Sequence, residues 1–295
     1  MNIPAGGTRY AIVTGAASGL GRAICLRLAR DHWQIVVCDI DLDGARDTLE
    51  LVKTAGGTGQ VERLDVSDPE QWVDLKSRLQ ASWPMLDLLV NNAGVACAGE
   101  IGRLSLENWH WTLNANLHGV IYGCHTMVPW LKANPQGAHV VNVASIAGML
   151  APPSMGPYNV SKAGVIALSE TMYSELRSQN VGVTVVCPGF FRTRLLDSGR
   201  FDTAKQREAA NRYTNEATTN AEEVADRTVR AIGTRQLYVI VPRRARTLWR
   251  VKRLWPKLLP DLFGRAFRAA KHAGAPAEPA ATTDDQLTTG SSARR

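Results

Sequence analysis

The sequence predicts an α/β protein whose core is a doubly wound parallel sheet of about seven strands. Two observations carry this prediction. Short runs of Val, Ile and Leu recur along the chain, and most are continuously apolar, as in strands that helices cover on both faces. The segments between these runs have the apolar spacing of helices. Strands that alternate with helices favour a parallel sheet.

The expected strands are bounded by turn residues and follow one another along most of the chain. They are residues 10–14, 34–39, 59–65, 86–92, 138–145, 181–188 and 237–242. Helical spacing is clear in GRAICLRLARD after the first strand and in AGVIALSETMYSELRSQ before the sixth. A further helix is expected from Ala221, with Asn220 as its N-cap and Glu223 as the partner of that cap.

Composition separates a folded body from a basic extension and a tail. We expect one domain over residues 1–242, with a surface excursion or lid at about 195–220, where the sequence is polar and weakly periodic. Residues 243–271 predict a basic amphipathic helical extension. Residues 272–295 contain little to bury and are predicted to be disordered.

The cysteines and the N-terminal sequence favour a cytoplasmic protein. The five cysteines are scattered and lack metal-ligand spacing, so we expect reduced thiols and no structural metal. The chain starts without a charged segment that leads into a long apolar one, and no run approaches the roughly 18 apolar residues of a spanning helix. Secretion by that route and a membrane span are therefore not expected.

A glycine-rich turn, TGAASGLG, follows the first strand and leads into a helix. Gly15, Gly19 and Gly21 permit a tight turn, and the free N–H groups at the helix N-terminus can hold a pyrophosphate. The spacing is G-x-x-x-G-x-G and not the more familiar G-x-G-x-x-G. The turn indicates a dinucleotide site, and a strand-to-helix turn without a ligand is the alternative.

Asp39 ends the second strand, 18 residues after Gly21, where a doubly wound dinucleotide site places the acid that bonds the adenosine ribose. A carboxylate there repels a 2′-phosphate, and neither Ser18 nor Ile40 supplies a cation for it. NAD is therefore expected in preference to NADP. Arg22 keeps NADP open as the alternative if its guanidinium bends toward the ribose.

The segment YNVSK places a phenol and an ammonium on one helix face. Tyr158 and Lys162 are four residues apart, so both side chains point into the same volume. A pair placed in this way can move a proton. Packing of a tyrosine at a helix start is the alternative for Tyr158.

Over about residues 10–242 the sequence resembles the short-chain dehydrogenase/reductase family, a Rossmann-like fold. The motifs TGAASGLG, LDV, NNAG, LNANLHG, VNVASIAG, YNVSK and PGFFRT occur in the family's order. The resemblance implies a catalytic, dinucleotide-binding domain. The cofactor-binding residues that the resemblance implies are Gly15, Ser18, Gly19, Leu20, Gly21, Asp39, Asp65, Val66, Asn92, Ala93, Gly94, Tyr158, Lys162, Pro188, Gly189 and Thr193.

The resemblance also implies four catalytic residues: Asn116, Ser145, Tyr158 and Lys162. Tyr158 would exchange the proton of the substrate oxygen while Ser145 bonds that oxygen, and the Lys162 cation would favour the phenolate. Asn116 would position a water that relays the proton. Each residue has a structural alternative, since Ser145 can cap a helix and Asn116 can satisfy a backbone carbonyl. Asn114 receives no role.

The residues expected around the substrate are apolar: Met149, Leu150, Met155, Phe190 and Phe191. Such a mouth favours a lipophilic secondary alcohol or ketone over a sugar or a hydroxy acid. Packing of these side chains against the lid is the alternative. An NADP-dependent 3-oxoacyl or carbonyl reductase and a non-catalytic dinucleotide-sensing scaffold are the other functions considered.

The basic charge is concentrated in the extension. Residues 243–271 hold ten Lys and Arg against one acid, a net of +9, so the remaining residues sum to −2 of the chain's +7. Trp, Leu and Phe recur there at helical intervals, which suits peripheral contact with the inner, anionic face of a membrane. Docking on the protein body is the alternative, and nucleic-acid binding is not expected. Pro256 and Pro260 are expected to divide the extension into two short helices.

The oligomeric state follows from the resemblance alone. The family commonly forms dimers and tetramers, so a homodimer or homotetramer is expected.

Overall fold

The computed structural model describes residues 7–191 and 193–272. Seven parallel strands form one sheet in the order β3-β2-β1-β4-β6-β7-β9, which confirms the predicted doubly wound sheet. The strands are β1 (Tyr10–Thr14), β2 (Gln34–Asp39), β3 (Thr58–Arg63), β4 (Leu88–Asn91), β6 (Ala138–Val143), β7 (Val181–Pro188) and β9 (Tyr238–Val241).

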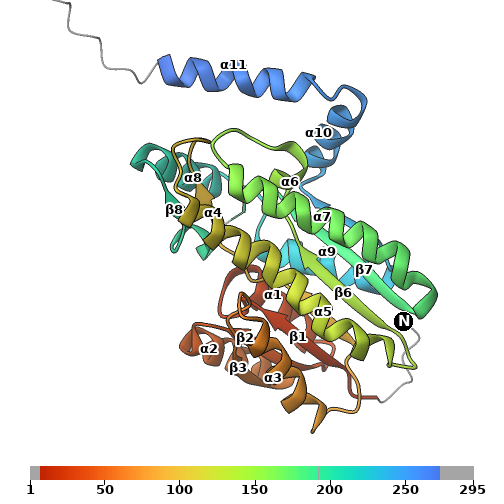
Figure 1. Ribbon diagram of the computed structural model, residues 1–295. Helices are drawn as coiled ribbons and strands as arrows, with labels where there is room; N and C mark the ends of the chain where they lie inside the picture. The colour runs from red at the N-terminus through yellow and green to blue at the C-terminus, as the bar shows by residue number, and fades with distance from the viewer. Residues whose placement is uncertain (1–6, 192, 273–295) are drawn as a thin grey trace, which may run out of the picture.

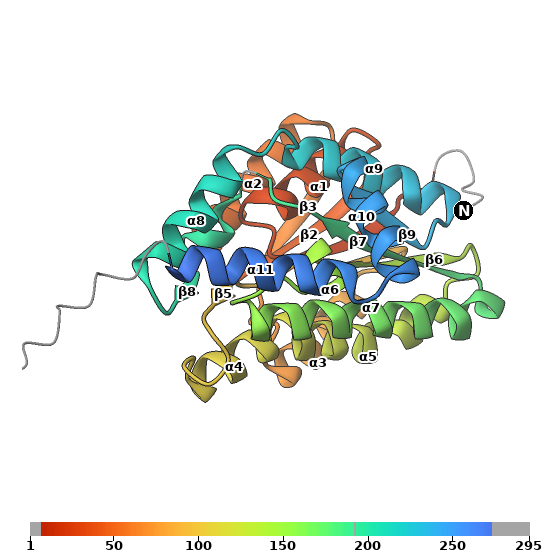
Figure 2. The same ribbon diagram turned by 90° about the horizontal axis from the view of Figure 1, so that it is seen from above.

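Helices cover both faces of the sheet, which explains why most of the strands are continuously apolar. One face carries α1 (Gly19–Ala29), α2 (Leu42–Thr54) and α9 (Ala221–Thr234) (Figures 1 and 2). The other face carries α3 (Pro69–Gln80), α5 (Gly119–Lys132) and α7 (Gly156–Leu176).

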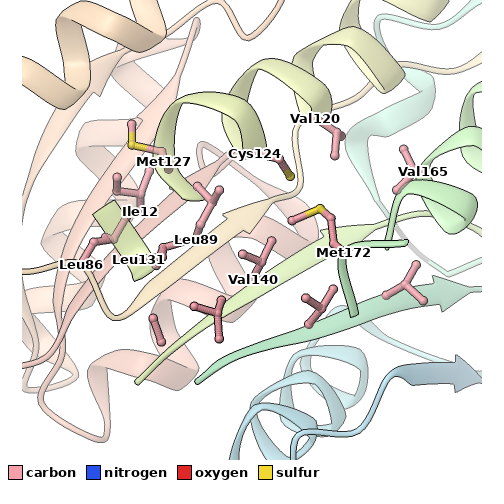
Figure 3. Close-up of a cluster of buried hydrophobic side chains, with 14 of the residues drawn as sticks. Ile12, Leu86, Leu89, Val120, Cys124, Met127, Leu131, Val140, Val165 and Met172 are labelled. Atoms are coloured by element: carbon pink, nitrogen blue, oxygen red, sulfur yellow. The ribbon is translucent and has the colours of Figure 1, made fainter. Parts of the chain in front are cut away.

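Two apolar clusters hold these layers together. On the α5 and α7 side, Met127, Leu131 and Met172 pack against Leu89 and Val140 of the sheet (Figure 3). On the opposite side, α1 and α9 contribute side chains such as Ile24 and Val224. Burial of these side chains removes a large apolar area from water and fixes the sheet between its helices.

The strand order reverses at β1. The chain runs outward from β1 to β2 and β3, then returns so that β4 pairs with the other edge of β1. Because the loops that leave β1 and β4 diverge at this point, a crevice opens above the carboxyl ends of the two strands. The glycine turn after β1 and the NNAG turn after β4 border it.

Smaller elements surround the carboxyl ends of the strands. They are β5 (Cys97–Ala98), α4 (Leu106–Leu113), a π-helical turn (Asn114–His118), α6 (Ile146–Leu150), a 3₁₀ turn (Arg194–Leu196), β8 (Arg200–Phe201) and α8 (Ala204–Asn215). A second 3₁₀ turn (Arg177–Gln179) lies at the opposite edge, between α7 and the start of β7. The polar stretch predicted as an excursion, about 195–220, thus contains β8, which pairs in parallel with β5, and the helix α8.

The start of α9 agrees with the expected cap in part. The Asn220 side chain accepts a hydrogen bond from the Glu223 N–H at 2.8 Å, so Asn220 is the N-cap. The Glu223 carboxylate does not return to the cap, because it accepts a bond from Arg227 one turn along the helix at 2.8 Å.

The basic extension forms two helices, α10 (Arg243–Leu254) and α11 (Leu258–His272). Pro256 lies at the break, whereas Pro260 lies inside α11, where its position in the first turn requires no N–H donor. Lys252 donates to the Met149 carbonyl at 2.8 Å and so attaches α10 to the body. The predicted tail lies outside the described residues, apart from His272 at the end of α11.

Among the helices that the structure describes, none combines the length and the apolar character needed to cross a bilayer.

Candidate active site

A cavity of about 540 Å³ lies over the crevice between β1 and β4. Most of the residues predicted to bind a cofactor line it. These are Gly15, Ser18, Gly19, Leu20, Asp39, Asp65, Val66, Asn92, Ala93, Gly94, Tyr158, Lys162, Pro188 and Thr193. The chain therefore gathers at one place residues that are separated by up to most of its length.

The glycine turn fits closely against the turn that follows β4. Gly15 has a φ of 61°, and a Cβ atom on it would lie 2.6 Å from the Ala93 Cα. Asn92 holds the two turns together by donating from its amide to the Thr14 and Gly15 carbonyls at 2.8 and 3.0 Å. Gly21 does not line the cavity, but a Cβ there would lie 2.2 Å from the Gly15 carbonyl oxygen. Side chains at Gly15 and Gly21 are thus excluded sterically.

Asp39 borders the cavity at the end of β2 and is fixed by two backbone donors. Its carboxylate accepts from the Ala17 N–H at 2.9 Å and from the Asp41 N–H at 3.0 Å. Arg22, which the sequence left as a route to NADP, points elsewhere. Its guanidinium bonds the Ala17 and Gly44 carbonyls and the Thr48 hydroxyl, and it does not line the cavity. Asp41 lines the cavity beside Asp39 and adds a second carboxylate there.

Tyr158 and Lys162 lie together in the cavity wall, on the first turns of α7. Both side chains are buried, and the Lys162 Nζ lies 5.8 Å from the centre of the Tyr158 ring. Lys162 donates to the Val143 carbonyl at 2.9 Å. Burial lowers the pKa of Lys162 to about 8. Burial also raises the pKa of Tyr158, while a hydrogen bond with Ser145 acts in the opposite direction.

This pKa result differs from the sequence expectation for Tyr158. The Lys162 cation was expected to favour the phenolate, but burial is the largest influence on the phenol and Ser145 supplies the opposing one. The physical reason is that removing a charge from water outweighs the hydrogen bond that stabilises it.

Ser145 follows β6 and lies next to the cavity residue Ala144. Its hydroxyl caps α6 by accepting from the Ala147 N–H at 3.1 Å and donates weakly to the Pro188 carbonyl at 3.4 Å. The helix-cap alternative from the sequence is therefore present together with the contact to Tyr158.

Asn116 is fully buried in the π-helical turn and does not line the cavity. Its amide bonds both backbone groups of Val95, accepting from the N–H at 2.7 Å and donating to the carbonyl at 2.9 Å. The amide also donates to the Ser161 hydroxyl at 3.3 Å. Asn116 thereby connects the turn after β4 to the helix that carries Tyr158.

Some residues that line the cavity were not predicted from the sequence. They include Ala17, Asp41, Ser67, Val95, Trp111, Asn114, Leu195, Asp197 and Ser198. Asn114, which the sequence analysis set aside, lies on the cavity, while Asn116 lies behind it. Gly189, like Gly21, does not line the cavity. Nothing in the sequence around Trp111, about one helical turn before Asn114, indicates that its side chain faces a ligand.

The apolar mouth differs from the one expected. Of the five residues named for it, Phe191 alone is among the residues lining the cavity. Met149 and Leu150 are buried, and Phe190 stacks on Tyr213 of α8 with ring centres 5.3 Å apart. Val95, Trp111 and Leu195 supply apolar wall in their place.

No group of three or more metal-ligating side chains gathers among the residues that the structure describes. The five cysteines are buried and unpaired. Burial raises the pKa of every one of these thiols, so they are protonated near neutral pH.

Comparison with known proteins gives a consistent result. Residues 9–203 match the family described as short chain dehydrogenase. A probable oxidoreductase EphD of Mycobacterium tuberculosis is 36% identical over 189 residues, which are 64% of this chain and 32% of that protein. The chain thus spans about a third of the length of this relative. A 3-oxoacyl-acyl-carrier-protein reductase FabG of Thermotoga maritima is 34% identical over 193 residues, 64% of this chain and 76% of that protein.

One solved structure covers more of the chain. A short-chain dehydrogenase/reductase from Burkholderia phymatum in complex with NAD superposes with a TM-score of 0.80 at 31% identity, over 85% of this chain and 95% of that one. The likeness therefore extends beyond the residues of the family match.

Proposed function

Because the chain belongs to the short-chain dehydrogenase family, we propose that it is an NAD-preferring oxidoreductase that interconverts a lipophilic secondary alcohol and its ketone. The observation that carries this proposal is the single cavity that brings Tyr158 and Lys162 together with the glycine turn and Asp39.

The residues present fit a dinucleotide. The Gly15 and Gly19 turn leaves room for a pyrophosphate at the N-terminus of α1, where backbone N–H groups are free to bind it. Asp39 would bond the adenosine ribose, and Asp65 and Val66 would hold the adenine. Lys162 would bond the nicotinamide ribose. Asn92, Ala93, Gly94, Pro188 and Thr193 complete the walls.

NAD fits this site better than NADP. Asp39 and Asp41 place two carboxylates where a 2′-phosphate would lie, and the guanidinium of Arg22 is turned to backbone carbonyls. Repulsion between like charges disfavours the phosphate. The NAD bound in the Burkholderia phymatum structure supports NAD as a cofactor that this fold accepts.

The chemistry centres on Tyr158. When bound, NAD supplies the acceptor for the hydride that leaves the carbinol carbon. Tyr158 takes the hydroxyl proton of the alcohol at its phenol oxygen in oxidation and returns it in reduction. Ser145 holds the substrate oxygen by a hydrogen bond. Ser145 also opposes the effect of burial on the pKa of the phenol, and the Lys162 Nζ lies 5.8 Å from the centre of the Tyr158 ring.

Asn116 also has a structural role. Its amide is committed to Val95 and Ser161, so its role is to hold the turn after β4 against the catalytic helix. The water-positioning role that the sequence suggested for Asn116 stays a prediction.

Nicotinamide absorbance tests the proposal. Purified protein is given NAD and then NADP with a panel of lipophilic secondary alcohols, with Tyr158→Phe as the comparison. Turnover with NAD that falls about 100-fold or more in Tyr158→Phe, while NADH still binds, supports the proposal.

Two other outcomes favour the other functions. Turnover with NADPH and a 3-oxoacyl thioester alone would favour a reductase like the one named for the Thermotoga maritima relative. Tight NADH binding without turnover of any substrate would favour a dinucleotide-sensing scaffold.

We further propose that α10 and α11 contact an anionic membrane surface from the cytoplasmic side. Leu254, Trp255, Leu258 and Leu262 are 70, 60, 45 and 47% exposed, and they lie among the cations of the extension. An amphipathic helix with exposed apolar residues and a basic face suits the headgroup region of anionic lipid. A lipophilic substrate dissolved in the membrane would reach the enzyme at this surface.

We also propose a homodimer or homotetramer, as is common in the family. Sedimentation velocity of the full chain at several concentrations tests this assembly; a single monomer peak throughout would contradict it.

A further inference from the structure

Trp111 supplies a large aromatic side chain to the wall of the cavity. It lies on α4 and lines the same cavity as Tyr158, whose other apolar lining residues include Val95, Phe191 and Leu195. Its side chain is half-buried. An indole is the largest flat apolar surface that a side chain offers, so Trp111 contributes a wall against which the substituents of a substrate can pack.

Arg200 stacks on this indole. The Arg200 guanidinium carbon lies 4.3 Å from the centre of the Trp111 ring, the distance of a stacked cation–π pair. The guanidinium also donates to the Glu107 carboxylate and to the Asn108 side chain, both at 3.1 Å. The flat guanidinium is therefore anchored to the helix that carries Trp111 and faces the ring.

The backbone of Arg200 is fixed as well. Arg200 belongs to β8, which pairs with β5, and its N–H donates to the Ala96 carbonyl at 3.0 Å. In Figure 2 the β5 and β8 pair lies beside α8 and near α4. The segment after β7 thus reaches across the mouth of the cavity and holds Trp111 through one side chain.

We propose that Trp111 determines substrate specificity and that Arg200 is the positioning residue that holds its indole against the substrate. This inference rests on the proposed alcohol dehydrogenase function. The substrate class it implies is a secondary alcohol with an apolar substituent of several carbons or a ring. A short alcohol does not reach the Trp111 indole and gains no binding energy from it.

The test measures kcat and KM with NAD for 2-propanol, 2-butanol, 2-hexanol, 2-octanol and cyclohexanol. Trp111→Ala should lower kcat/KM for 2-octanol and cyclohexanol by about tenfold and for 2-propanol by less than about twofold. The loss should appear as a higher KM with kcat nearly unchanged, because a wall binds ground state and transition state alike. Trp111→Phe should be intermediate. The Kd of NADH, measured by fluorescence, should not change.

Trp109→Ala is the matched control. Trp109 is on the same helix and is also half-buried, but it packs against Gly156 and is not among the residues lining the cavity. It should leave the ratio of kcat/KM between 2-octanol and 2-propanol unchanged. An equal change of this ratio in Trp109→Ala, or a uniform change across all alcohols in Trp111→Ala, would overturn the inference.

The role of Arg200 is tested through Trp111. Arg200→Ala should lower the ratio of kcat/KM for 2-octanol to that for 2-propanol by about threefold, and Arg200→Lys should restore part of this loss. The double variant Trp111→Ala/Arg200→Ala should show no further shift beyond Trp111→Ala. Arg207, which lies over Phe201 and not over Trp111, gives the control Arg207→Ala. Additive effects in the double variant would show that Arg200 does not act through Trp111.

Failure of the proposed function is distinct from failure of this inference. If the wild type binds NADH and oxidises none of the alcohols, the proposed function is wrong and the inference falls with it. If the wild type oxidises them and the selectivity of Trp111→Ala is unchanged, the inference alone is wrong.

Discussion

Lys162 donates from its ammonium to the carbonyl oxygen of Val143, 2.9 Å away at the end of β6. The bond ties the helix that carries Tyr158 to the central sheet, and it holds a cation in a buried position. Burial without a carboxylate partner is why the pKa of Lys162 falls from 10.5 to about 8.

The first prediction concerns this lysine and pH. The pKa of Lys162 is lower in the folded state than in the unfolded state, so the folded state loses its proton first as the pH rises from about 8 to 10.5. Over this window Lys162 raises the free energy of unfolding, by roughly 3 kcal/mol in total. Below about pH 8 both states are protonated, and the cost of burying the ammonium is fully present.

Lys162→Met removes this titration. The stability of the variant relative to the wild type should therefore be greatest below pH 8 and decline toward pH 10.5. Urea unfolding at pH 7 and at pH 10 measures the difference, with the exposed Lys205→Met as control. A relative stability that is the same at both values contradicts the prediction.

The second prediction concerns the choice between NAD and NADP. Asp39→Ala should lower kcat/KM with NAD by about tenfold, because the ribose loses a charge-assisted hydrogen bond. Asp39→Ser combined with Ile40→Arg should raise kcat/KM with NADP, since a cation replaces a carboxylate near the 2′-phosphate. Asp43→Ala, at an exposed carboxylate paired with Arg46, should leave both values unchanged. An unaltered NAD to NADP ratio in the double variant would mean that Asp39 does not select the cofactor.

The third prediction concerns the packing of the glycine turn. A methyl group at Gly21 would lie 2.2 Å from the Gly15 carbonyl and 2.6 Å from the Asn92 amide, so Gly21→Ala must displace the turn. We expect a loss of about 1 to 3 kcal/mol in stability and weaker NADH binding.

Gly233→Ala is the control for Gly21. Gly233 lies in α9 with nothing within 4 Å of an added Cβ, so alanine there should stabilise the helix slightly, by about 0.5 to 1 kcal/mol. Thermal unfolding and NADH fluorescence titration measure both variants. Equal stabilities of the two variants would disprove the steric argument.

The fourth prediction concerns the membrane surface. Leu258→Glu/Leu262→Glu places two carboxylates on the exposed face of α11, and should reduce the fraction of full-length protein that sediments with phosphatidylglycerol vesicles by about tenfold. Phosphatidylcholine vesicles should bind little of the wild type, and added salt should weaken binding to the anionic vesicles.

Val73→Glu serves as the control for this experiment. Val73 is 59% exposed on α3, on the body of the protein, so its substitution should leave sedimentation unchanged. If wild type and the α11 variant sediment alike, contact through α11 is wrong.

Local patterns accounted for most of the fold. Short apolar runs bounded by turn residues predicted the seven strands of the large sheet, and most of these runs are continuously apolar because strands between two helical layers bury both faces. The sequence also placed Asn220 at the start of α9 and a break in the extension at Pro256. It did not predict that Pro260 would lie inside α11, since a proline in a first turn disrupts no hydrogen bond.

The cavity residues that belong to a sequence motif could be predicted from the sequence. The glycine turn, Asp39, Tyr158 and Lys162 are recognisable from spacing, because a phosphate turn and a helix face are local geometries. Trp111, Asn114 and Leu195 were not recognisable, since they reach the cavity only through the packing of α4 and of the segment after β7. Met149 and Leu150, which were expected at the mouth of the cavity, are instead buried by packing between elements that the sequence pattern does not relate to one another.

The sequence by itself determined the succession of strands and helices along the chain, the phosphate turn, and the placing of Tyr158 and Lys162 on one face of a helix. Only the tertiary structure decided that Asn116 lies behind the cavity, that Arg22 bonds backbone carbonyls, and that burial outweighs the Ser145 hydrogen bond in its effect on the pKa of Tyr158. Spacing along the chain fixes which side chains share an element. Contacts between residues far apart in the sequence decide which of these side chains meet across elements and how deeply they are buried from water.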